Sequence, residues 1–475
     1  MNRLSAATLH AVPDAVARPA YDPADVAIGV VHFGPGAFHR AHQAAYFDAL
    51  LAHDPRWGIA AVSLRTRGVV DALAAQDGLY SLTTLDAETS TRIVAAHRAW
   101  LGPDDGERVL DLLGRAETRL VTTTVTEKGY CLTGDGRLDF DHADIAHDLG
   151  RPAFPRSVIG WIVAGLARRR AAGLPPFAVL CCDNMADNGD TLRAATIAFA
   201  RRQDDALADW IAAEGAFPNT MVDSITPATD DRHLARTAAI LGVEDRAAIQ
   251  REAFTQWVVA DVALPGSPDL GSVGVIRTAS VAMYERAKLR MLNGAHSALA
   301  YLGIARGHAS VADAMADADL ARFVEAMVRQ DVIPTVGDLP GFDLGGYADA
   351  IFARFRNPAI RHLLSQIAWD GSQKLPYRLL HTLADAHDAG RPVDRLLLPI
   401  AAWMRFVAEK ARTGDTLTDP LAAELVAAAA GAGDADALVD RLLGFAQIFP
   451  AELAEDGGIR AGLRSAVRTL EAGAL

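Results

Sequence analysis

The run Ala27-Ile-Gly-Val-Val-His-Phe33 leads directly into Gly34-Pro-Gly-Ala-Phe-His-Arg40. The first run is short, apolar and β-type, and residues 41–52 have the pattern of a helix. A strand, then Gly-x-Gly, then a helix is typical of the entry to a Rossmann-type, dinucleotide-binding fold. There the glycines let the backbone approach a pyrophosphate, and the helix N-terminus favours its charge. His39 stands where the full pattern has its third glycine, so the match is incomplete.

Further segments predict strands of the same sheet, and each ends in polar residues. The strand segments are 57–64, 119–125 and 177–182. The residues that follow them are, in order, Arg65-Thr-Arg67, Thr126-Glu127 and Asp183-Asn184. A further strand and loop at 219–227 carries Asp223, and 256–260 and 274–280 finish the sheet region. Strand carboxyl ends are where α/β sheets place their chemistry, although Asp-Asn can also be a helix cap and Asp223 a turn carboxylate.

The composition changes near residue 280 to an almost wholly helical pattern rich in alanine and leucine. Candidate helices are 284–303, 310–327, 348–355, 359–367, 396–410 and 421–430. Between two of them, Gly, Ser and Pro at 370–378 predict a loop. The sequence therefore predicts an α/β protein with two domains. Residues 1–280 form a Rossmann-type N-terminal domain, and residues 281–475 form a mainly α-helical C-terminal domain.

The bulk composition narrows the function classes. The chain has 475 residues, a formal net charge of −13 and 51% hydrophobic residues. Such a charge argues against nucleic acid or an anionic membrane as partner, but a small pocket can still be basic. The three cysteines, Cys131, Cys181 and Cys182, match no disulfide framework or Cys-x-x-Cys site. Residues 1–20 lack a signal-peptide core and no run reaches membrane-spanning length, so we expect a cytoplasmic protein.

The stretch Lys288-Leu-Arg-Met-Leu-Asn293-Gly-Ala-His296 lies in the predicted helix 284–303. At about 100° per residue, Asn293 and His296 would lie roughly 140° and 80° around the helix from Lys288. A partly dry lysine can act as a base, an amide can donate to a developing oxyanion, and an imidazole can orient a hydroxyl. Polar residues at helical spacing are, however, usually a solvated face, and Asn-Gly can end a helix. The spacing alone leaves both interpretations open.

The spacing of lysine, four residues, asparagine, two residues and histidine resembles the signature of the polyol-specific long-chain dehydrogenases, the mannitol dehydrogenase family. The strings at 34–42 and 126–130 are similar to the same family. The string 366–376 and the residues around Lys288 are more similar to its fructuronate reductase members than to its mannitol 2-dehydrogenases. The resemblance therefore implies an NAD(P)-dependent oxidoreductase that interconverts a secondary alcohol and a ketose without a metal.

The resemblance also implies roles for individual residues. Lys288 is the general base, Asn184 and Asn293 hold the oxygen through its alkoxide-like stage, and His296 orients the substrate. Asp223 tunes the lysine electrostatically, and Glu285, one helical turn before Lys288, helps to pass the proton towards solvent. The residues expected to bind the cofactor are Gly34, Gly36, Ala37, Phe38, Arg65, Arg67, Thr126 and Glu127.

Cofactor and substrate follow as finer expectations. We expect NAD, while Arg65 and Arg67, at the position where acidic residues usually bind the ribose hydroxyls, keep NADP open. Lys374 and Arg378 are expected to bind the substrate, and two cations suit a carboxylate, which favours fructuronate/mannonate over fructose/mannitol. Mannitol 2-dehydrogenase or another polyol dehydrogenase is the alternative, and a non-catalytic NAD(P)-binding sensor is an alternative of another class. A monomer and a small homo-oligomer both fit the sequence.

Overall fold

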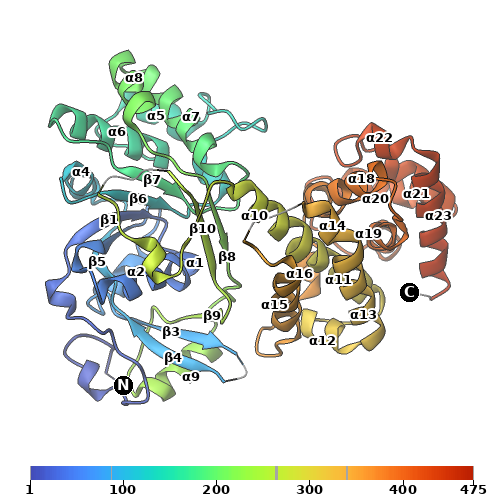
Figure 1. Ribbon diagram of the computed structural model, residues 1–475, viewed down its shortest axis with the longest axis horizontal. Helices are drawn as coiled ribbons and strands as arrows, with labels where there is room; N and C mark the ends of the chain where they lie inside the picture. Colours follow the sequence, from blue (N-terminus) through green and yellow to red (C-terminus); the bar gives the residue numbers. More distant parts are fainter. Residues whose placement is uncertain (1, 87, 263–265, 338–340, 474–475) are drawn as a thin grey trace. The chain divides into compact units, whose positions relative to one another are not determined.

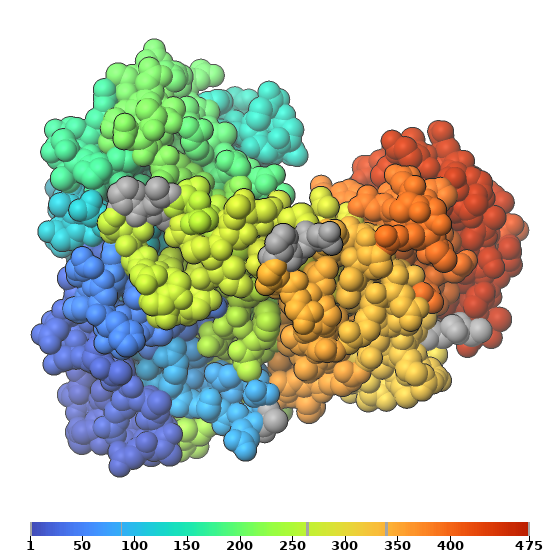
Figure 2. Space-filling view, viewed as in Figure 1, coloured from blue at the N-terminus to red at the C-terminus, as the bar shows by residue number. Residues whose placement is uncertain are grey.

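The computed structural model describes residues 2–86, 88–262, 266–337 and 341–473. Its contacts divide the chain into two compact units, Met1–Ala282 and Met283–Leu475 (Figure 1). Figure 2 shows both units in space-filling form, coloured along the chain. The first unit contains all the strands named below and the second is built from helices, which confirms the predicted fold class.

The first unit is organised around a five-stranded sheet in the order β5-β2-β1-β6-β7, with every neighbouring pair parallel. The strands are β1 (Ile28–Phe33), β2 (Gly58–Val62), β5 (His97–Leu101), β6 (Leu120–Thr123) and β7 (Ala178–Cys181). β1 is central, with β2 on one side and β6 on the other, so the strand order reverses there. In α/β sheets such a reversal places the ligand crevice at the strands' carboxyl ends.

Helices cover both faces of this sheet, and the side chains of β1 alternate between them. Val31 packs with α4 (Gly106–Gly114), α6 (Val158–Ala171), α7 (Asn188–Arg201) and α8 (Asp205–Glu214). Val30 packs on the other side with α1 (Ala37–Ala41), α2 (Gln43–Leu51) and α3 (Gly68–Ala74). Each fully buried valine or leucine contributes about 1.5–3 kcal/mol of hydrophobic stabilisation. The run at 27–33 is apolar because β1 is buried on both of its faces.

The later strands of this unit do not extend the main sheet. β8 (Thr220–Asp223), β10 (Gln256–Ala260) and β11 (Ile276–Thr278) form a separate three-stranded sheet. A second small sheet contains β3 (Tyr80–Leu85), β4 (Ser90–Val94) and β9 (Ile249–Glu252). The remaining α-helices of the unit are α5 (Ala143–Gly150), α9 (Asp231–Leu241) and the start of α10 (Val281–Ala287).

The second unit surrounds α11 (Gly294–Ala305), whose residues 294–303 are all buried. A helix that is apolar all round must be covered on every side. It packs against α12 (Val311–Ala316), α13 (Ala318–Ala326), α16 (Leu364–Ile367) and α19 (Asp394–Thr413). The other α-helices are α14 (Ile333–Val336), α15 (Leu344–Arg356), α17 (Gly371–Leu375), α18 (His381–Asp388), α20 (Ala422–Ala430), α21 (Ala435–Leu443), α22 (Ala451–Ala454) and α23 (Gly457–Glu471). Within the described residues, no helix has the length and apolar character needed to span a membrane.

Three sequence predictions in this unit were wrong. The predicted helix 310–327 is interrupted at Asp317, whose side chain accepts hydrogen bonds from Asp319 N and Leu320 N and so begins α13. The segment 359–367 is α-helical only at Leu364–Ile367. The predicted loop 370–378 is instead α17 followed by a π-helical segment, Pro376–Leu380.

Gly371 explains why the segment 370–378 was predicted to be a loop but is helical. A Cβ at Gly371 would lie 2.5 Å from Trp403 Nε1 and 2.7 Å from Tyr301 Oη. The glycine therefore permits close packing inside the unit, whereas the sequence pattern attributed it to a turn. Pro376 lies where α17 continues into the π-helical segment.

Candidate active site

The glycine loop after β1 needs a residue without a side chain at Gly34. Its φ is +90°, and a Cβ there would lie 2.1 Å from the Thr124 carbonyl oxygen. His32 supports the loop from below, because its Nε2 lies 3.1 Å from Gly34 O and its Nδ1 lies 2.7 Å from Thr122 Oγ1. A carbonyl can only accept, so Nε2–H donates to Gly34 and Nδ1 accepts from the threonine. β1 and β6 thus fix the loop in place.

His39, at the position of the missing third glycine, also has a packing role. Its ring stacks on His32 with centroids 3.3 Å apart, and its Nε2 lies 3.0 Å from His97 Nε2. Burial lowers the pKa of His32 and of His97 to about 3 each, and it lowers the pKa of His39 well below its usual value. His42 Nε2 donates to Gln256 O at 2.9 Å. The rings of His32, His39 and His97 are therefore neutral packing groups.

A cavity of about 300 Å³ lies over this loop. It is lined by the glycine loop, the end of β2, the loop after β6 and the start of α6. Of the residues expected to bind the cofactor, the lining includes Gly34, Gly36, Arg65 and Thr126, and it does not include Ala37, Phe38, Arg67 or Glu127. It also includes Arg156 and Ser157, which the sequence analysis missed. Ser157 Oγ accepts a hydrogen bond from Gly160 N and caps α6. A serine directly before an apolar helix is a sequence signal for such a cap.

The two arginines after β2 have different surroundings. Arg65 lines the cavity, and its Nη2 lies 2.9 Å from Asp144 Oδ2. Arg67 is held by Asp71 and Asp105, each 3.2 Å from its guanidinium. Both cationic charges are therefore compensated by carboxylates, and of the two only Arg65 lines the cavity.

Asp183 connects the ends of β6 and β7. Its carboxylate accepts from Val125 N at 2.9 Å, from Thr126 N at 3.1 Å and from the Tyr130 hydroxyl at 2.6 Å. Burial raises its pKa from the usual aspartate value. Asn184 follows as an exposed residue, and α7 begins only at Asn188, so Asn184 is not the cap of that helix. Asp223 is buried at the end of β8, opposite Gln256 in β10.

The predicted catalytic stretch in the second unit is not a regular α-helix. Lys288–Asn293 is a π-helical segment between α10 and α11. In a π-helix the hydrogen bonds join residues five apart, so position i+5 lies roughly one full turn from position i. Lys288 and Asn293 are five apart and therefore share one face, which corrects the 140° separation expected from α-helical geometry. The backbone remains helical at Asn293, so Asn-Gly does not end the helix here.

Gly294 has a packing reason of its own. A Cβ at this position would lie 2.7 Å from the Arg378 carbonyl oxygen. Arg378 belongs to the π-helical segment Pro376–Leu380, so the glycine lets two π-helical segments touch. π-Helical turns are rare and occur often at functional sites.

Cations and imidazoles gather beside this contact. His296 is 6% exposed, stacks on Phe355 with centroids 4.3 Å apart, and meets the edge of His362 at 5.0 Å. Burial, and then His362, Arg378 and Arg354, lower the pKa of His296 well below its usual value. Burial, and then Arg378, lower the pKa of Lys374. The predicted residues Asn293, His296, Lys374 and Arg378 thus lie in one region of the second unit.

Three polar atoms in this region lack a hydrogen-bond partner among the described residues: Asn293 Oδ1, His296 Nε2 and His362 Nδ1. Buried polar atoms are rarely left unpaired, so these atoms suit the hydroxyl groups of a bound sugar. His362 and Arg354 could not be predicted from the sequence, because nothing local links them to Lys288. Glu285 lies one turn before Lys288 on α10, while Asn184 and Asp223 belong to the first unit.

Comparison with known proteins gives a consistent result for both units. Residues 28–271 match the mannitol dehydrogenase Rossmann domain, and residues 280–471 match the mannitol dehydrogenase C-terminal domain. D-mannonate oxidoreductase of Escherichia coli is 40% identical over 465 residues, which cover 96% of each chain. Mannitol 2-dehydrogenase of Phaeosphaeria nodorum is 38% identical over 465 residues, 95% of this chain and 81% of that protein.

Among solved structures, the ternary complex of Pseudomonas fluorescens mannitol 2-dehydrogenase with NAD and D-mannitol aligns with a TM-score of 0.84. It is 35% identical, and the alignment covers 99% of this chain and 97% of that one. All three relatives are named as dehydrogenases or oxidoreductases, and nothing supports the alternative of a non-catalytic sensor.

Proposed function

Because this chain belongs to the mannitol dehydrogenase family, we propose that it is an NAD(P)-dependent hexonate dehydrogenase that interconverts mannonate and fructuronate. The observation that carries the choice of substrate is the cationic region around Arg378. Within the described residues, neither Lys374 nor Arg378 forms an ion pair with a carboxylate; the Arg378 guanidinium donates to Ser297 Oγ at 3.3 Å. Asp370 and Asp419 lie near enough to Lys374 to act on its charge, whereas no carboxylate of the described residues does so at Arg378. A half-buried cation such as Arg378 favours a substrate that carries its own carboxylate.

The proposed reaction removes a hydride and a proton from one secondary alcohol. NAD(P)⁺ supplies the hydride acceptor, and the glycine loop with its cavity fits a dinucleotide. Lys288, as a neutral amine, takes the hydroxyl proton as the carbonyl forms. Glu285 passes that proton towards solvent. The products are the ketose and the reduced cofactor, and the proton is accounted for without a metal.

Amides and an imidazole complete the proposed site. Asn293, on the same face as Lys288, donates its amide to the oxygen as negative charge builds on it. Asn184 is proposed as a second donor, and Asp223 as the carboxylate that tunes the lysine. His296 Nε2 hydrogen-bonds a substrate hydroxyl. The role of His296 is supported by the orphaned buried nitrogen.

For the cofactor we propose NAD. An NADP site usually has an uncompensated arginine for the 2′-phosphate. Here Arg65 is paired with Asp144, and Arg67 with Asp71 and Asp105.

An Arg378→Ala substitution tests the choice of substrate. It removes a cation proposed to meet the carboxylate, so kcat/KM for fructuronate should fall by about 10–100-fold, as expected for loss of a charge-assisted contact. The value for fructose should fall much less. Arg361→Ala, an exposed arginine in the same unit, is the matched control. Equal losses for fructuronate and fructose would favour the alternative, a mannitol 2-dehydrogenase.

A further inference from the structure

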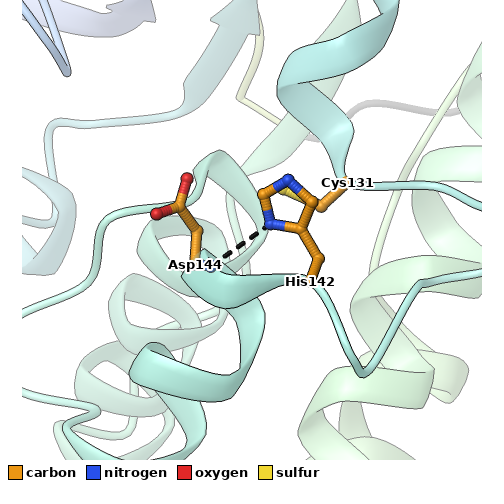
Figure 3. A group of neighbouring side chains, drawn as sticks. All are labelled: Cys131, His142 and Asp144. Carbon is orange, nitrogen blue, oxygen red and sulfur yellow. Dashed lines mark hydrogen bonds between the residues drawn. The ribbon is translucent and has the colours of Figure 1, made fainter.

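Cys131, His142 and Asp144 lie together in the first unit, outside the residues proposed for catalysis (Figure 3). One ligand atom from each side chain lies within 4.8 Å of the others. Cys131 is buried, directly after the turn that ends at Tyr130, while His142 and Asp144 are half-buried at the start of α5. Their spacing along the chain matches no metal-binding motif, so only the fold brings them together.

We propose that these three side chains bind one thiophilic divalent cation, with zinc as the best fit. A thiolate, an imidazole and a carboxylate are all ligands that Zn²⁺ accepts, and three protein ligands leave a fourth position for water. His142 Nδ1 accepts from Asp144 N at 3.2 Å, the dashed line in Figure 3, and this leaves Nε2 for the metal. Asp144 Oδ2 pairs with Arg65, which leaves Oδ1.

Metal binding requires the Cys131 thiol to lose its proton. The Cys131 thiol has one hydrogen-bond contact among the described residues, 3.8 Å from Gly129 O. Binding forms the sulfur–metal bond and releases the thiol proton to solvent.

Asp144 links this cluster to the dinucleotide cavity. Its carboxylate lies 2.9 Å from Arg65, and Arg65 lines the cavity with Gly34. A metal ion and the Arg65 guanidinium thus share the Asp144 carboxylate, so the interaction of either one with Asp144 weakens that of the other. Since coupling between two sites is reciprocal, removing the guanidinium should tighten metal binding. None of the three ligands has a role in the proposed reaction, so turnover does not depend on the metal.

Cobalt substitution tests the site directly. The full-length protein, freed of metal with a chelator, is titrated with Co²⁺ and followed by absorption, and Zn²⁺ then displaces the cobalt. We expect one equivalent, a thiolate-to-cobalt charge-transfer band and the visible bands of four-coordinate cobalt. Cys131→Ser should abolish the charge-transfer band, and His142→Asn, whose amide oxygen can still cap α5, should weaken binding by about tenfold or more.

His147→Asn is the matched control, because His147 lies on the same helix and its Nδ1 lies 3.0 Å from Asp148 Oδ1. Its affinity for Co²⁺ should equal that of the unmodified protein. Arg65→Ala should bind Co²⁺ several-fold more tightly. A titration without a charge-transfer band, or one unchanged in Cys131→Ser or His142→Asn, would overturn the site. Unchanged affinity in Arg65→Ala would overturn the link to the cavity.

Discussion

Lys288 and Asn293 share a face because the chain makes a π-helical turn between them. This brings a proposed base and a proposed oxyanion donor together on one short segment. The proton leaves the hydroxyl as the hydride leaves the carbon, so both groups must contact the same oxygen. Five intervening peptide steps on an α-helix would have turned the amide away from the amine.

Replacing Lys288 with alanine removes the proposed general base. We expect kcat to fall by about 10²–10⁴-fold, as for the loss of a general base, and small amines to restore part of it. Dinucleotide affinity should not change, because the cavity lies in the first unit. Lys410→Ala is the control, since Lys410 pairs with Asp415 at the end of α19. Normal turnover by folded Lys288→Ala would show that another group takes the proton.

Arg65 and Arg67 give a paired test of the cofactor. The unmodified protein should have a higher kcat/KM with NADH than with NADPH. Arg65→Ala should lower the residual NADPH efficiency by about tenfold, the cost of one charged contact to a 2′-phosphate. Arg67→Ala should leave it unchanged, because Arg67, unlike Arg65, does not line the cavity. A wild-type preference for NADPH would contradict the assignment of NAD.

At the scale of elements, three histidines from β1, α1 and β5 pack together beside the glycine loop: His32, His39 and His97. The folded-state pKa values of His32 and His97 are about 3, below the value near 6.5 expected when unfolded. The unfolded chain therefore binds more protons below pH 6.5. The stability that these neutral rings contribute is full above that pH and declines as pH falls towards 3, by about 1.4 kcal/mol per pH unit and group.

Removing one of these imidazole rings should therefore make the free energy of unfolding less dependent on pH. In urea unfolding between pH 7 and 5, His97→Gln should lose less stability on acidification than the unmodified protein. Its amide can still donate to His39 Nε2, so the stack is kept. His53→Gln, at an exposed histidine, is the control and should match the unmodified slope. Identical slopes for all three proteins would mean that the stack does not titrate on unfolding.

The sequence predicted the first unit better than the second for a physical reason. Buried parallel strands and the glycine at position 34 leave local signals, since both depend on near neighbours. The π-helical turns do not, because a fixed 100° per residue cannot represent an i to i+5 pattern. Gly371 and Pro376 carry the usual loop signal, yet Gly371 is explained by Trp403, far away in the chain.

Site residues divide in the same way. Lys288, Asn293 and His296 were recognisable because they share one motif. The fold alone places Arg156 in the cavity lining and His362 against His296. No spacing along the chain connects either residue to the motif. For Asp183 a helix cap was one of two interpretations of the sequence, but its carboxylate joins the ends of β6 and β7.

At the scale of the whole molecule, each unit supplies one part of the proposed chemistry. The first contains a cavity of about 300 Å³ over a glycine loop, and the second contains the cationic region around Arg378. The family matches cover both units, at residues 28–271 and 280–471. We propose that the chain reduces a ketose that carries a carboxylate, with a nicotinamide cofactor and without a metal.

The most direct test measures steady-state NADH oxidation by EDTA-treated protein, with fructuronate and fructose as parallel substrates. We predict full activity after chelation and a kcat/KM for fructuronate at least about tenfold above that for fructose, the value of roughly one charge-assisted contact. Activity that requires added metal, or equal efficiency with the two ketoses, would contradict the account.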